Sequence, residues 1–98
     1  MPQIETIPVY VYDGVVFPGC SERIKVREPI SIAMMRNCMS DGSCFGCIPS
    51  KPGRLEAPAV YSVGTVVEVL TMNEGTFKDI EVTVLGMHRF RVIELTST

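Results

Sequence analysis

Short runs of alternating apolar and polar residues, separated by glycine and proline, limit most strongly how this chain can fold. In residues 21–26, for example, Ile24 and Val26 alternate with charged residues. This period of two places successive side chains on opposite faces of a β-strand. We predict strands at residues 7–12, 21–26, 44–48, 61–72, 77–85 and 89–95. In this scheme Gly86 is a break between the last two strands.

One further segment has the periodicity of a helix. Pro29 suits the first helical position because its missing amide hydrogen is not needed there. An apolar stripe at helical spacing follows, formed by Ile32, Met35, Cys38 and Met39. Gly42 marks the end of the helix, where glycine is common. Six short strands and one helix predict a mainly β, α+β fold, a small β-barrel that closes to protect its strand edges.

Size and charge restrict the class of protein. The 98 residues suffice for one domain, residues 1–98, and the 46% apolar content exceeds that of a disordered chain. Nine basic against eleven acidic residues disfavour nucleic acid as a partner, because phosphate binding normally needs a basic excess. No apolar run approaches the ~20 residues of a membrane helix, and the first residues do not resemble a signal peptide. We expect an intracellular, cytoplasmic protein without a membrane partner, the nucleus being the alternative.

The four cysteines and the single histidine are the candidates for metal or redox chemistry. Cys44 and Cys47 form a CxxC pair, but a strand places residues three apart on opposite faces. A zinc site needs four ligands, and neither Cys20 nor His88 stands at a paired spacing. We therefore expect free thiols that act as small buried apolar residues, with no metal, no cofactor and no catalytic residue. A small thiol enzyme is the alternative.

Five motifs in order resemble those of the LON substrate-binding domain family. The first, IPVYVYDGVVFPG, is similar to the family's IPVLPL strand with its following FPG turn. The motifs lie at residues 7–19 (IPVYVYDGVVFPG), 27–29 (REP), 45–46 (FG), 61–66 (YSVGTV) and 86–92 (GMHRFRV). Met87 and His88 depart from the more usual Arg-rich pair, and the cysteines replace residues that are more often Val or Leu.

The resemblance implies a PUA-like β-barrel, which in the family is usually followed by a helical bundle. The family occurs in ATP-dependent Lon proteases, cereblon-type ubiquitin-ligase receptors and small stand-alone proteins. We expect the barrel half alone, as a stand-alone protein or a fragment. The implied function is non-catalytic recognition of unfolded or degron-bearing protein segments for Lon-type degradation. Docking to a ligase adaptor protein and RNA binding by a PUA-like barrel are the alternatives.

The predicted binding face combines the start of the first strand with the end of the fourth strand and its turn. An extended peptide can add to an exposed strand edge or lie on an apolar patch. The predicted protein-binding residues are Ile7, Pro8, Tyr10, Leu70, Met72 and Phe77. The alternative is that Ile7 and Leu70 belong to the core. A barrel without its helical cover also predicts self-association through exposed apolar surface.

Overall fold

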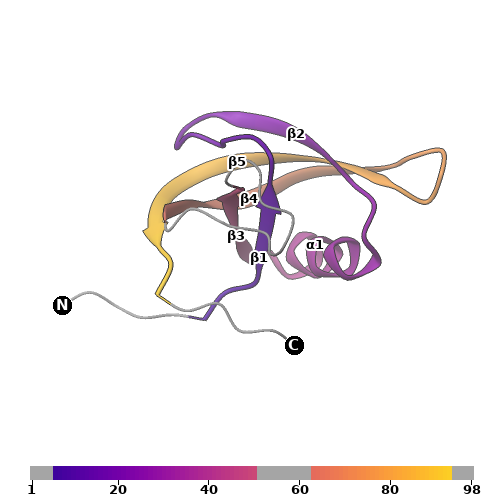
Figure 1. Cartoon of the computed structure of the whole chain (residues 1–98). Coiled ribbons are helices and arrows are strands. Elements are labelled where there is room, and N and C mark those ends of the chain that lie inside the picture. Colours follow the sequence, from indigo (N-terminus) through magenta and orange to yellow (C-terminus); the bar gives the residue numbers. More distant parts are fainter. Residues whose placement is uncertain (1–5, 51–62, 94–98) are drawn as a thin grey trace, which may run out of the picture.

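Five strands and one helix make up residues 6–50 and 63–93, the part of the chain that the computed structural model describes. The elements are β1 (Val9–Tyr12), β2 (Ser21–Val26), α1 (Pro29–Asp41), β3 (Cys44–Pro49), β4 (Val63–Glu74) and β5 (Ile80–Arg91). The strands form one sheet in the order β1-β3-β4-β5-β2, and α1 packs against β4 and β3 (Figure 1). β1 and β3 are parallel, and the other neighbours are antiparallel. The mainly β fold with one helix is confirmed.

The sheet is open, so the predicted closed barrel of six strands is wrong for the described residues. β1 and β2 form the two edges of the sheet. Between them, the connecting segment 13–20 makes a single bridge, from Pro18 to Gly86 on β5. Pro18 has no amide hydrogen to donate, and Gly19 adopts a φ of 82°, so this segment cannot continue as a strand. A loop therefore lies where strand pairing would have closed the barrel.

Gly86 does not break the chain into two strands, because β5 runs through it without interruption. Its carbonyl accepts a hydrogen bond from the Gly19 amide at 2.8 Å, and its own amide donates to the Cys20 carbonyl at 2.9 Å. A Cβ atom at this position would overlap the backbone of Phe17. Glycine is thus required by the close approach of segment 13–20 rather than by a strand end.

α1 begins and ends where the sequence predicts. Pro29 lies in its first turn, and Gly42 follows it with a φ of 74° and an amide that donates to the Cys38 carbonyl at 2.9 Å. Met35 and Cys38 are buried as predicted, whereas Met39 is 45% exposed and lies outside the core. Within the described part of the chain, no helix has the length and apolar character needed to cross a membrane.

The core lies between α1 and one face of the sheet. Its buried members are Val16, Ile24, Val26, Met35, Cys38, Phe45, Cys47, Val67, Val69, Ile80, Val82 and Val84. Thr65 on β4 is a polar side chain buried beside this cluster. Its hydroxyl donates to the Val16 carbonyl at 2.8 Å. This hydrogen bond ties segment 13–20 to the centre of the sheet.

Candidate functional site

The six predicted binding residues do not form one patch. Tyr10 on β1 aligns through its β3 partner Cys47 with Thr65 on β4. Leu70 lies five residues beyond Thr65 on β4, which is roughly 16 Å at the rise per residue of a β-strand. The structure therefore separates a β1 group, residues 7, 8 and 10, from a β4 group, residues 70, 72 and 77.

The β1 group is partly engaged in the fold. Ile7 is half-buried, and its side chain lies beside Gly46 on β3. Pro8 is exposed, but its carbonyl accepts a hydrogen bond from the Gly46 amide at 2.8 Å. Tyr10 packs against the core, and burial raises the pKa of its hydroxyl, with the Glu28 carboxylate adding to the effect. Ile7 and Tyr10 thus have structural roles whatever they bind.

A β-bulge separates Leu70 from Met72 in the β4 group. The register between β4 and β5 shifts between Val69 and Thr71, which leaves Leu70 without a partner on β5. One extra residue reverses the alternation of a strand, so Met72 points to the same face as Val69. Met72 accordingly packs against the core, whereas Leu70 is 42% exposed.

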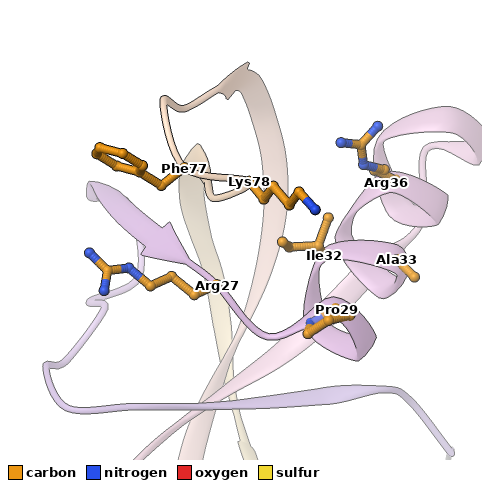
Figure 2. Close-up of a pocket in the computed structure, with 7 residues that line it drawn as sticks. All are labelled: Arg27, Pro29, Ile32, Ala33, Arg36, Phe77 and Lys78. Carbon is orange, nitrogen blue, oxygen red and sulfur yellow. The ribbon is translucent and has the colours of Figure 1, made fainter.

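Phe77 belongs to a hollow of about 470 Å³ between α1 and the turn that joins β4 to β5 (Figure 2). One wall is the face of α1 that carries Pro29, Ile32, Ala33 and Arg36. Their spacing of three, one and three residues puts them on one side of the helix. The other lining residues are Phe77 and Lys78 from the turn and Arg27 from the β2–α1 connection. We call this hollow the α1–turn groove.

The turn gives Phe77 and Lys78 different directions. Figure 2 shows the Lys78 side chain extending toward Ile32 on α1, and Phe77 on the far side of the turn from the helix. Phe77 is 84% exposed. Lys78 has a φ of 59°, a left-handed conformation that an unbranched non-glycine residue adopts only at an energetic cost. Backbone strain of this kind is often found at functional surfaces.

Three basic side chains surround the groove, and only one of them has an ion-pair partner in the described part of the chain. The guanidinium of Arg36 donates from Nη2 to Oε1 of Glu74 at 2.6 Å, which links α1 to the end of β4. Arg27 and Lys78 form no ion pair with a residue in 6–50 or 63–93. The floor beneath these charges is apolar, formed by Ile32, Ala33 and Pro29. The groove can therefore contact an apolar side chain and an anionic group together.

The basic residues of the groove, Arg27, Arg36 and Lys78, are not among the predicted binding residues. Helical spacing from Pro29 already places Ala33 and Arg36 on one face, so a helical projection could have found that wall. Lys78 has no such signal, because its direction depends on the left-handed turn. Among the predicted binding residues, the groove contains only Phe77.

The cysteines lie outside the groove. Cys38 and Cys47 are buried as predicted, Cys44 is half-buried, and Cys20 is exposed, contrary to prediction. Burial raises the pKa of the Cys47 thiol to about 12, so this thiol stays protonated at neutral pH. In the segments that the structure describes, no three His, Cys, Asp or Glu side chains gather in a way that could hold a metal ion.

Two Lon proteases are similar to this chain in sequence. Lon protease 2 of Myxococcus xanthus is 29% identical over 102 residues, which cover 97% of this chain and 12% of that protein. The Lon protease of Porphyromonas gingivalis is 32% identical over 101 residues, which cover 96% of this chain and 12% of that protein. The chain therefore spans only about an eighth of the relatives it matches.

The fold leads to the same family. A crystal structure of a Lon N-terminal domain protein from Xanthomonas campestris matches with a TM-score of 0.77 and 25% identity. The match covers 97% of this chain and 53% of that one. The family model for the ATP-dependent protease La (LON) substrate-binding domain matches residues 6–98. Because sequence and structure agree over nearly the whole chain, it belongs to the LON substrate-binding domain family.

Proposed function

We propose that this domain binds exposed apolar segments of unfolded or degron-bearing polypeptides and presents them to a Lon-type, ATP-dependent protease. Its membership of a substrate-binding family supports this function, and the relatives reported above are Lon proteases. The observation that carries the proposal is Phe77, an aromatic side chain 84% exposed at the edge of a groove with an apolar floor.

Recognition in this groove depends on apolar contact rather than on a shaped pocket. An unfolded segment exposes side chains that a folded protein buries, and these can contact the Ile32–Ala33 face of α1 and, on the far side of the turn, the exposed ring of Phe77. Each 100 Å² of apolar surface removed from water contributes roughly 2.5 kcal/mol. Contacts of this size give weak, sequence-tolerant binding, which suits a domain that must accept many substrates.

The other predicted residues extend this proposal. Leu70 lies on the same hairpin as Phe77 and is 42% exposed, but on the face opposite the core, so it would form a contact outside the groove. Ile7, Pro8 and Tyr10 would form a separate contact at the β1 edge, where an extended peptide can add a strand. In this arrangement Phe77 provides the stronger contact, because it has no packing role to lose.

The test compares two exposed apolar residues of the same domain. Phe77→Ser removes the proposed contact, and Ile30→Ser removes a side chain that is 81% exposed but does not line the groove. We expect Phe77→Ser to weaken binding of a fluorescein-labelled, reduced casein chain about tenfold, measured by anisotropy, because one large apolar contact is worth about 1.4 kcal/mol or more. Ile30→Ser should bind as the wild type does. Equal binding by all three proteins would refute the groove as the site.

A further inference from the structure

We infer that the α1–turn groove prefers protein segments in which an acidic residue stands next to an apolar one. This inference rests on the proposed function and adds a substrate class to it. The whole chain carries a net charge of −2, yet the groove is lined by Arg27, Arg36 and Lys78. The local charge is therefore opposite in sign to the charge of the chain.

The basic residues reach the groove from three separate elements. Arg27 follows β2, Arg36 lies in the third turn of α1, and Lys78 belongs to the β4–β5 turn. Figure 2 shows Lys78 and Arg36 on the α1 side of the groove and the Arg27 side chain extending away from α1. The fold supplies one carboxylate, Glu74, which pairs with Arg36 at 2.6 Å. Two cations remain without an ion-pair partner in the described residues.

The pair of Arg36 and Glu74 shows how a substrate carboxylate would be held. Glu74 comes from the end of β4 and reaches the rim of the groove, and its carboxylate accepts a charge-assisted hydrogen bond. A segment lying across Ile32 would pass between Lys78 and Arg36, whereas the Arg27 side chain extends away from α1 (Figure 2). An acidic residue adjacent to its apolar anchor would thus meet a cation on either side.

The same pair sets a limit on the preference. Glu74 occupies Arg36, and its own negative charge repels an incoming carboxylate. Glu74→Gln keeps the shape of the side chain and removes the charge. We therefore expect this variant to bind acidic segments two- to threefold more tightly than the wild type does. A role of Glu74 in holding α1 to the hairpin only would predict no gain.

Three peptides that differ only beside the apolar anchor test the inference. Each carries the same Leu-Phe pair, flanked by Asp, by Asn or by Lys, and a fluorescein label for anisotropy. We expect the Asp peptide to bind about tenfold more tightly than the Asn peptide at 50 mM salt, the effect of one charge-assisted hydrogen bond. The Lys peptide should bind most weakly. At 300 mM salt the differences should shrink, because exposed charges are screened.

Matched variants locate the preference. Lys78→Glu should abolish the advantage of the Asp peptide, and Lys78→Asn should reduce it. Arg23→Glu is the control, because it reverses a positive charge as Lys78→Glu does. Arg23 is exposed on β2 and does not line the groove, so this variant should keep the preference for the Asp peptide. Far-ultraviolet circular dichroism checks that each variant is folded.

The outcomes separate the inference from the proposed function. Equal binding of the Asp and Asn peptides by the wild type would overturn the inference and leave apolar recognition in place. A preference that Arg23→Glu reduces as much as Lys78→Glu does would overturn the groove as its origin. Failure of all three peptides and of the casein chain to bind would overturn the proposed function together with the inference.

Discussion

The two ends of the β4–β5 ribbon are built differently. At one end, residues 65–68 of β4 pair with β3 on one side and with β5 on the other, and Thr65 and Gly86 contact segment 13–20. We call this the crossing end. Beyond Glu68, β4 pairs with β5 alone, and the turn at residues 75–79 extends past α1 (Figure 1). This second part is the hairpin end.

The contrast lies in what surrounds the backbone. At the crossing end, Gly64 lies so close to β3 that a Cβ atom would stand 2.7 Å from the Cys47 carbonyl oxygen. The ring of Phe90 covers Gly64 and Gly46. A Cβ atom on Gly46 would stand 2.6 Å from Cζ of that ring. At the hairpin end, residues 73–78 are all exposed. We conclude that the backbone at the crossing end is tightly enclosed, while the turn at the hairpin end is exposed to solvent.

The two ends should differ most in how much stability they lose when one methyl group is added to a glycine at each end. Gly86→Ala places a Cβ against the Phe17 backbone, which cannot rotate away, and we expect a loss of about 3 kcal/mol in the free energy of unfolding. Gly75→Ala meets mainly the half-buried Asp79 carboxylate, which can turn aside at the cost of its hydrogen bond from the Phe77 amide, so we expect a smaller loss of about 1 kcal/mol. Urea denaturation measures both. Similar losses would mean that the two ends are equally constrained.

A smaller effect is expected from removing one buried hydrogen bond. Thr65→Val keeps the shape of the side chain but leaves the Val16 carbonyl without its donor, at a cost of about 1–2 kcal/mol. For a domain of this size that is a fall in Tm of roughly 4–16 °C. Thr71→Val, at an exposed position of the hairpin end, should change the free energy of unfolding by less than about 0.5 kcal/mol. An unchanged Tm for Thr65→Val would show that segment 13–20 is held by other contacts.

Local signals in the sequence were enough for most elements. The bounds predicted for residues 21–26 are those of β2, and Pro29 and Gly42 delimit α1 as expected. In these segments the residues that carry the sequence pattern are the same residues that form the element. Binary alternation and a helix cap therefore predict elements correctly without knowledge of distant neighbours.

The errors concern contacts between distant segments. A glycine in a strand can end it or permit a close approach, and only the position of Phe17 decides this for Gly86. The bulge at Leu70 likewise depends on the register with β5, and it places Met72 in the core rather than beside Leu70. The sequence pattern predicts that Phe77 begins a strand, but β5 begins at Ile80, and no local signal indicates that α1 lies beside the turn before it.

Stability at high pH should also depend on the crossing end. The Cys47 thiol aligns with Thr65, and burial raises its pKa to about 12, whereas the unfolded thiol titrates near 9. Above pH 9 the unfolded state therefore holds fewer protons than the folded state, and stability falls as pH rises. We expect a loss of about 1 kcal/mol between pH 9 and 10.

Denaturation of Cys47→Ala over the same pH range provides the comparison. The substitution lowers stability at every pH because it leaves a small cavity, but it should flatten the pH dependence. Tyr10 and Tyr12, whose pKa values burial also raises, act in the same direction at higher pH. An equal slope in wild type and variant would assign the alkaline loss to these tyrosines or to other groups.

The smallest expected effect is a gain, and it belongs to the hairpin end. Lys78 adopts a φ of 59°, which asparagine tolerates better than lysine. Lys78→Asn should therefore raise the free energy of unfolding by about 0.5 kcal/mol, seen as a rise in Tm, while it weakens binding of the acidic peptide. A side chain that lowers stability where it stands but improves recognition is expected of a binding surface and not of a scaffold. If Lys78→Asn were both less stable and fully able to bind, the strain at this turn would have no role in recognition, and the division between the two ends would rest on packing alone.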